Sequence, residues 1–487
     1  MDGERRGSTR SGELGAAAEG PRPVTHLPTL DAELVAPLDE LGTTIRLRVR
    51  HAMREGQLKP GTRIYHVWKT HYFGGGFNTS HSEETREDWD WSALHDLIES
   101  VEQHAGSAIE QAAKALATTA TVDLPAARGH LRHFLRLAAQ ASVEGGSRRQ
   151  LQRLAQRFLH EASGGAVSWK VNAWLGGISV EGDLKIGAGL RLRAPRSEDF
   201  DVEVPADVPL PPWHPSGWGL FSDLPAAILE IERRSPEGPA HEIRKIVNAL
   251  CLFRPGSVWI LKEKPHSDSI LMSPAESWHP RPVSTRFSYR VSPADRRRLR
   301  AFVSRVAPAL PVKPTGVHLD RKSGRSAIGF KQYFHAIHDA SDAEDRTALA
   351  VASLEGILVR KGETEISRRL AQRTAVLLGF AGLSAADVNR QMKKAYDIRS
   401  AFDHGELSTV KGRAEAQAVQ ATILEYARLA LLKHLEVDRW PNDKDKFLND
   451  LDEALLDDSK RRELRKELSG GLWKLAGPPS GGGEGKQ

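Results

Sequence analysis

The chain has 487 residues, of which 40% are hydrophobic and 27% are charged, a balance typical of a globular protein with a sizeable core. Its formal charge of +6 permits contact with nucleic acid without requiring it, and its single cysteine, Cys251, excludes a disulfide framework within the chain and a cysteine zinc cluster. No segment approaches the ~18 apolar residues of a membrane span or resembles a secretory signal, so we expect a cytoplasmic protein without membrane contact.

The N-terminal part of the chain is predicted to be a tail followed by helices. Residues 1–26 are rich in Gly, Arg, Ser and Ala without periodicity, which indicates a disordered tail. The region 27–163 is predicted to be mostly helical, because residues 93–116 and 126–160 carry apolar residues at helical spacing. Three glycines lie within residues 72–77, but no Lys-Ser/Thr follows them, so we interpret this stretch as a loop and not as a phosphate-binding P-loop.

Residues 164–290 are predicted to form a β-rich central domain with one or two helices. Residues 167–175 alternate between apolar and polar types as in a half-buried strand, and further short strand patterns follow with glycine-bearing turns. The region also holds a concentration of tryptophans, which favours packing in a core and leaves a stacking face for nucleic acid as the alternative. These residues are Trp169, Trp174, Trp213, Trp218 and Trp259.

The C-terminal part is predicted to be helical. After a helix and linker at 291–324, residues 325–440 read as an antiparallel helical bundle, because each helix carries one apolar stripe. Residues 441–487 are predicted to form a C-terminal helix and a flexible tail. The four bundle helices are expected at about 342–359, 365–378, 386–403 and 413–435. The fold class is therefore α+β and multidomain, with a helical N-terminal region, a β-rich centre and an all-α C-terminal bundle.

The third bundle helix ends in an Arg-x4-His motif made by Arg399 and His404. Ser384 and Asp387 give this helix a capping start, and Gly405 predicts that it ends at His404 or just before it. The same spacing occurs elsewhere in the chain, so the spacing alone is not specific and the surrounding residues must decide.

Those surroundings resemble the HEPN superfamily, in particular the Apea-like HEPN domain of prokaryotic defence proteins. Three ordered blocks, at 345–358, 365–378 and 394–405, are similar to the family's opening helix with its Leu-Glu element, its second helix and its Tyr-Asp-x-Arg-Ser…His-Gly block. The similarity covers about residues 325–437. Many catalytic HEPN motifs have Asn, Asp or His directly after the arginine, whereas this chain has Ser400, as the Apea-like branch often does.

The resemblance implies a metal-independent endoribonuclease that acts as a homodimer, with the catalytic Arg399 and His404 of both protomers in one cleft. Such a protein would be an RNA-cleaving effector of anti-phage (abortive infection) or stress defence, released by a possible phage-derived trigger, and it would need no cofactor. The chemistry agrees, because an imidazole titrates near pH ~6.5 and a guanidinium stays protonated and presents a planar fork to phosphate oxygens. The alternative is a non-catalytic HEPN module for RNA binding or dimeric scaffolding.

Several other residues are weighed beside this pair. Ser400, Asp403, Glu355 and Arg373 are supporting candidates, although ion pairs inside the bundle are the simpler interpretation of Glu355 and Arg373. Arg399 itself has a structural alternative, in which it pairs with a carboxylate such as Glu355 or Glu365. The nearby histidines His335 and His338 are spaced like a metal-binding pair, but no third ligand is evident, so no metal is implied.

Overall fold

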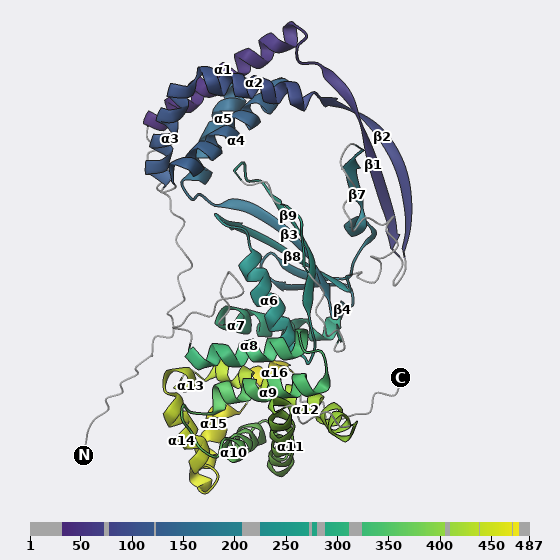
Figure 1. Ribbon diagram of the computed structural model, residues 1–487, viewed down its shortest axis with the longest axis vertical. Coiled ribbons are helices and arrows are strands. Elements are labelled where there is room, and N and C mark those ends of the chain that lie inside the picture. The colour runs from purple at the N-terminus through teal and green to yellow at the C-terminus, as the bar shows by residue number, and fades with distance from the viewer. Residues whose placement is uncertain are drawn as a thin grey trace, which may run out of the picture. The chain divides into compact units, whose positions relative to one another are not determined.

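The computed structural model divides the described residues into two compact units (Figure 1). One unit takes in the chain up to residue 59 together with 91–163, and the other takes in 60–90 together with the chain from 164 onward. The predicted tail 1–26, the three-glycine stretch, Trp213 and Trp218 lie outside the described residues. The described residues are 32–72, 77–120, 123–206, 225–271, 275–279, 288–310, 324–404, 410–437, 439–469 and 471–476.

The first unit is made of helices that bury one apolar face each. The segment 126–160, expected to be helical throughout, is two helices, because the chain turns at Gly145 with a φ of +82° and a new helix then begins. Ser147 caps this second helix in a capping box with Gln150, which satisfies two free backbone N–H groups. The helices are α1 Ala32–Arg54, α2 Trp91–His104, α3 Gly106–Ala120, α4 Leu124–Val143 and α5 Arg148–Ala162.

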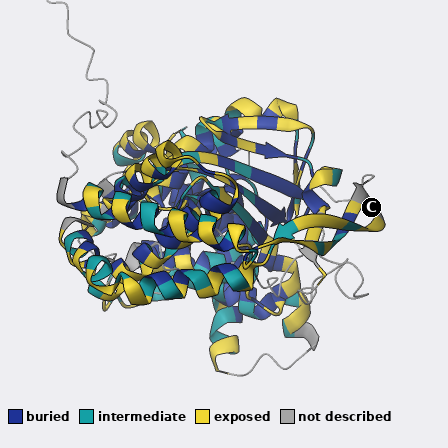
Figure 2. Ribbon diagram, turned by 90° about the horizontal axis from the view of Figure 1, so that it is seen from above, coloured by how far each residue is buried: buried dark blue, intermediate teal, exposed yellow. Residues whose placement is uncertain are grey.

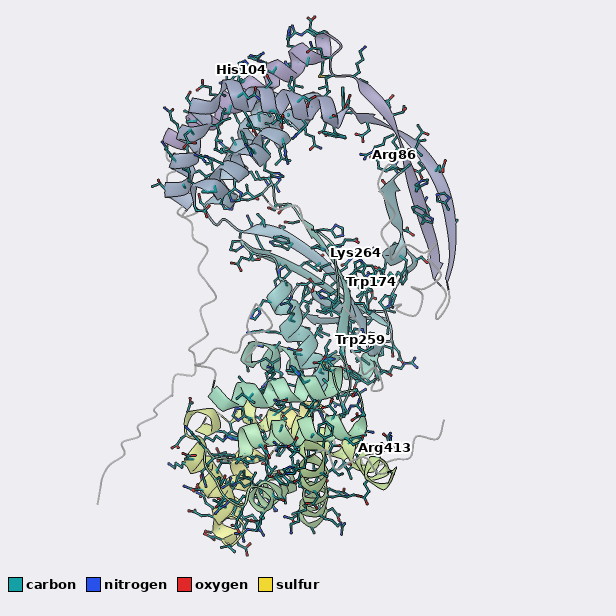
Figure 3. The ribbon with its side chains drawn as sticks, viewed as in Figure 1. Arg86, His104, Trp174, Trp259, Lys264 and Arg413 are labelled. Carbon is teal, nitrogen blue, oxygen red and sulfur yellow. The ribbon has the colours of Figure 1, made fainter. Side chains whose placement is uncertain are left out.

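A long β-hairpin, which the sequence did not predict, interrupts the helices in the chain and belongs to the second unit. Strands β1 (Pro60–Tyr72) and β2 (Phe77–Trp89) pair antiparallel along their whole length, and β7 (Val202–Pro205) pairs with β1. Arg86, labelled in Figure 3, bonds Glu203 of β7 and thereby ties β2 to the third strand. The sequence did not predict the hairpin because β2 is polar on both faces and lacks the alternation of apolar and polar residues that is typical of a half-buried strand.

The centre of the second unit is a six-stranded antiparallel sheet of order β10-β9-β3-β8-β6-β5. Buried residues, dark blue in Figure 2, run along its strands. Helix α6 (Ala240–Phe253) connects β8 to β9, and β11 pairs with β4 in parallel. The strands are β3 Val167–Gly176, β4 Ile178–Val180, β5 Asp183–Gly187, β6 Leu190–Arg193, β8 Ala227–Ser235, β9 Trp259–Ser267, β10 Ser277–Trp278 and β11 Tyr289–Val291, and short 3-10 helices span Ser197–Phe200 and Pro293–Asp295.

The C-terminal helices continue the core of the sheet. One cluster of buried apolar residues extends from the strands through α6 to the last helix, so the predicted regions 164–290 and 325–440 share a core. Residues 441–476 were expected to hold one helix, but they form several short ones, whose apolar residues Phe447 and Leu464 join that core. The helices are α7 Arg296–Ala309, α8 Gly324–His338, α9 Ala343–Leu358, α10 Ile366–Gly379, α11 Ala385–Asp403, α12 Val410–Glu436, α13 Arg439–Asn442, α14 Lys444–Glu453, α15 Asp458–Leu468 and α16 Leu472–Ala476.

The chain is thus a mixed α and β protein with N-terminal helices, a central sheet region and C-terminal helices, as the sequence predicts. None of the helices within the described residues is long and apolar enough to cross a membrane.

Candidate functional site

Helix α11 has the limits that its sequence predicts. At its start, the Ser384 hydroxyl accepts a hydrogen bond of 3.4 Å from the backbone N–H of Asp387. At its end, His404 is the capping residue, and its backbone N–H donates to the carbonyl of Ser400 over 3.1 Å. Gly405, the predicted terminator, lies outside the described residues. The Arg-x4-His motif therefore occupies the last turn of a bundle helix and the residue that follows it.

Arg399 reaches from α11 to α9, where its guanidinium forms an ion pair with Glu355. Its Nε also lies 3.5 Å from a carboxylate oxygen of Asp403, and its charge is 6.0 Å from the centre of the Tyr396 ring. The side chain is 23% exposed. Burial by itself lowers the pKa of Arg399, but hydrogen bonding to Glu355 and the charge of Asp403 outweigh it and raise the pKa above its ordinary value. Arg399 is thus a fixed cation, and the structural alternative, pairing with Glu355, is the arrangement that the structure has.

His404 is exposed at the tip of α11. Among the described residues, no hydrogen bond or ion pair joins its side chain to Arg399, whose charged partners are Glu355 and Asp403. Helix geometry explains this, since a five-residue offset rotates by about 140° around an ideal helix. The structure therefore brings Arg399, Glu355 and Asp403 together and leaves His404 facing solvent beside them. Ser400, another supporting candidate on α11, is half-buried.

Arg373 lies on α10 and is completely buried, in an ion-pair network of its own. All five of its N–H donors are used: two go to the carboxylate of Glu363, two go to that of Asp452, and the fifth goes to the Leu358 carbonyl at 2.8 Å. Its bonds to the two carboxylates measure 2.6 to 2.8 Å. A guanidinium with every donor occupied and no exposed surface has nothing left for a substrate. Arg373 therefore stabilises the bundle, and it does not share partners with Arg399.

The two nearby histidines have different environments. His335 lies 3.5 Å from Asp339, whereas the ring of His338 contacts the Ser257 hydroxyl at 3.1 Å and the Cys251 sulfur at 3.7 Å. Burial lowers the pKa of His338 to about 4. Within the described residues, His335 and His338 therefore contact different partners.

A cluster of tryptophans and lysines on the sheet was not anticipated as a unit. Trp174 is buried, and its ring lies 5.3 Å from the ammonium of Lys262 and 5.1 Å from that of Lys264; Figure 3 labels Trp174, Trp259 and Lys264. Lys262 also pairs with Glu276, and burial, the largest effect on it, lowers its pKa to about 8. The sequence feature that could have indicated this cluster is the pair Lys262 and Lys264, which lie on either side of Glu263 in β9. Trp174 packs in an apolar cluster with Ile228 and Leu261. Its burial therefore favours a role in core packing over a stacking face for nucleic acid.

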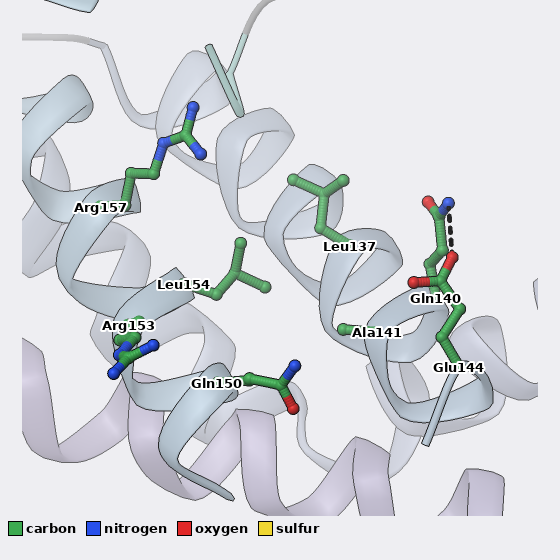
Figure 4. A pocket seen from close by; sticks show the side chains of 8 residues that line it. All are labelled: Leu137, Gln140, Ala141, Glu144, Gln150, Arg153, Leu154 and Arg157. Carbon is green, nitrogen blue, oxygen red and sulfur yellow. Dashed lines mark hydrogen bonds between the residues drawn. The ribbon is translucent and has the colours of Figure 1, made fainter. Parts of the chain in front are cut away.

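A separate hollow lies in the first unit, between α4 and α5 (Figure 4). It has a volume of about 390 Å³, and its lining includes the apolar Leu137 and Leu154 as well as Arg153 and Arg157. Arg157 is paired with Glu161 at 3.4 Å. None of the residues of the Arg399 cluster lines this hollow.

Comparison of the chain with family models, curated proteins and solved structures gives no match. The similarity to the HEPN superfamily therefore stays a prediction from the residues of α9, α10 and α11.

Proposed function

We propose that this protein is a metal-independent endoribonuclease of HEPN type that acts as an effector in anti-phage or stress defence. The observation that carries the proposal is the Arg-x4-His motif at the tip of a bundle helix. There Arg399 is a permanently charged and partly exposed guanidinium, and His404 is an exposed imidazole at the helix end. A fixed cation and an imidazole that can take up and release a proton are the two kinds of group that RNA cleavage without a metal requires.

The reaction follows from these two side chains. His404 removes the proton from the ribose 2′-hydroxyl, and the oxygen attacks the adjacent phosphorus. The bond to the 5′-oxygen breaks as that oxygen takes up a proton from a protonated imidazole. Arg399 stabilises the additional negative charge on the phosphorane. The products are a 2′,3′-cyclic phosphate and a 5′-hydroxyl, and DNA is inert because it lacks the attacking hydroxyl.

A homodimer would supply the two imidazoles that this mechanism uses. Within one chain, Arg399 and His404 are separated by about 140° around the helix. Pairing of two α11 tips would place the Arg399 of one protomer beside the His404 of its partner and would also bring two imidazoles, one as base and one as acid, to a single phosphate. The exposed side chain of Phe402, which lies between them in sequence and is 37% exposed, is an apolar group available for such a contact.

The Glu355 ion pair is the observation that favours the second candidate, a non-catalytic module for RNA binding or dimeric scaffolding. A carboxylate that already holds the guanidinium must be displaced or shared before a phosphate binds. In the catalytic case, Glu355 and Asp403 orient Arg399 and the phosphate takes its remaining donors. In the non-catalytic case, the same ion pair serves only to join α11 to α9.

The test compares the parent protein with Arg399→Ala and His404→Ala on a labelled RNA in buffer containing EDTA, with and without a candidate phage-derived trigger. Two matched controls are Arg390→Ala, which removes an arginine of the same helix that is 73% exposed, and His335→Ala, which removes another accessible histidine. We expect cleavage to fall by about 10²-fold or more in His404→Ala, the usual contribution of one acid–base group, and by a similar factor in Arg399→Ala, which loses the charge that stabilises the phosphorane; cleavage should remain in the controls.

The products and substrates sharpen this test. The RNA fragments should end in a 2′,3′-cyclic phosphate, and an RNA with one 2′-deoxy sugar should resist cleavage at that position. Cleavage that survives both Arg399→Ala and His404→Ala would remove the assigned site. Binding of RNA by the parent without any cleavage would favour the non-catalytic module.

A further inference from the structure

One face of the β1–β2 hairpin gathers two histidines and a glutamate. In the antiparallel register, His66 lies opposite Glu83, and Trp68 lies opposite His81. Directly paired residues share a face of the sheet, and so do residues two apart along a strand. All four side chains therefore project from the same face, whatever their rotamers.

The ligand atoms of three of these side chains converge. The Nδ1 atom of His66 lies 3.1 Å from the Nε2 atom of His81 and 3.6 Å from a carboxylate oxygen of Glu83. All three ligand atoms are within 4.8 Å of one another. In a tetrahedral zinc site with bonds of about 2.0–2.1 Å, neighbouring ligand atoms lie about 3.4 Å apart. The separations of 3.1 and 3.6 Å thus lie on either side of the value that a shared metal ion would impose.

The imidazole of His81 is held in place by its neighbour. Its ring stacks on Trp68, with ring centres 4.7 Å apart and planes inclined by 27°. Such support of a ligand by a second residue fixes the direction of its nitrogen and is common around protein metal sites. By contrast, His95 and Glu99 form an ordinary histidine–carboxylate pair at 3.3 Å on the surface of α2, and no third ligand joins them among the residues that the structure describes.

We propose that His66, His81 and Glu83 bind one divalent first-row transition metal ion, with Zn²⁺ as the expected cation. Two imidazole nitrogens and one carboxylate oxygen suit Zn²⁺ and its neighbours, whereas Mg²⁺ and Ca²⁺ prefer oxygen ligands alone. Glu83 is 60% exposed, so the three ligands lie at the surface, where a water molecule can supply the fourth coordination position. The site joins β1 to β2 and is independent of the metal-free chemistry proposed for Arg399 and His404.

A hydrogen bond between two neutral imidazoles would also account for the contact between His66 and His81. That arrangement needs neither Glu83 nor a cation. Metal binding and its dependence on all three residues therefore separate the two explanations.

The experiment uses the full-length protein without a polyhistidine tag, freed of metal by dialysis against EDTA and then against metal-free buffer. Zn²⁺ is titrated by calorimetry, and Co²⁺ is used as a second probe, because a tetrahedral Co²⁺ site gives a distinct visible absorption. The variants are His66→Ala, His81→Ala and Glu83→Gln, and the matched control is His95→Ala. Far-UV circular dichroism checks that each variant is folded.

The parent and His95→Ala should bind one equivalent of Zn²⁺ that both histidine variants lack, and Glu83→Gln should bind it more weakly. Outer-shell substitutions typically cost about 10–100-fold in metal affinity, so loss of a ligand should cost at least about tenfold. Failure of the parent to bind Zn²⁺, or equal binding by the parent and all three variants, would overturn the proposal. If His81→Ala were misfolded, Glu83→Gln and His66→Ala would still test whether the metal site exists. Glu83→Gln in particular should fold, because the side chain of Glu83 is 60% exposed.

Discussion

Replacement of Arg373 by methionine tests whether this buried arginine stabilises the bundle or serves the candidate site. Methionine keeps most of the length and apolar contacts of the side chain but removes its charge and its five donors. The change leaves the carboxylates of Glu363 and Asp452 and the Leu358 carbonyl without their shared partner. Glu363 is only 6% exposed, so water cannot fully replace the lost bonds.

The expected loss of stability follows from this network. Removing one partner of a buried ion pair typically costs about 3–5 kcal/mol, because the remaining charge stays buried. Here Arg360 lies 3.3 Å from Glu363, and Arg369 lies 3.6 Å from Asp452, so both carboxylates keep a cation nearby. We therefore expect the lower end of the range, about 3 kcal/mol.

Urea unfolding followed by far-UV circular dichroism, supported by calorimetry to separate the transitions of the two units, measures this difference. The control is Arg368→Ala on the same helix, where the side chain is 58% exposed and pairs with Glu365, and its effect should stay within about 0.5 kcal/mol. A loss below about 1 kcal/mol for Arg373→Met would refute the reasoning. Loss of RNA cleavage in an Arg373→Met protein of unchanged stability would instead place Arg373 at the site.

The same network predicts a dependence on acid. Burial alone would raise the pKa of Glu363, but hydrogen bonds from Arg373 and from the backbone of Arg360 hold it at about 2, below its ordinary value of 4.5. A lowered pKa in the folded state means that the stabilisation is complete above pH 4.5 and is lost as the pH falls towards about 2. The free energy of unfolding of Arg373→Met should vary less than that of the parent across this range.

Two further predictions concern other buried positions. Burial lowers the pKa values of His338 and His434 from 6.5 to about 4. Between pH 6.5 and 4 the unfolded chain therefore binds protons that the folded chain does not, and the melting temperature should fall as the pH drops through this range. An unchanged melting temperature would contradict the burial of these two imidazoles. Gly177 has a φ of +73°, and a Cβ there would overlap the Ser257 carbonyl oxygen, so Gly177→Ala should lose more than about 2 kcal/mol in urea unfolding. Gly182→Ala, at a φ of +70° in open space, should lose only about 1 kcal/mol, and equal losses would rule out the steric explanation.

The amino-acid sequence determined the elements that local patterns specify. The limits of α11 follow from the cap at Ser384 and the stop at His404, and α9 begins after Asp342, whose side chain accepts the backbone N–H of Asp345. Each of these caps depends only on residues within one or two helical turns of each other, so the sequence alone predicts it. The apolar stripe of each helix then predicts which face is buried. The strand β3, with its alternating pattern, was readable for the same reason.

Only the tertiary structure decided which distant residues meet. The polar strand β2 is a strand because β1 pairs with it, and the register that sets His66 beside Glu83 exists only once that pairing forms. Likewise, the sequence left both Glu355 and Glu365 as partners for Arg399, and the packing of α11 on α9 places Glu355 beside it. Pairing and packing depend on contacts between segments far apart in the chain, and a local pattern carries no information about which partner will be there.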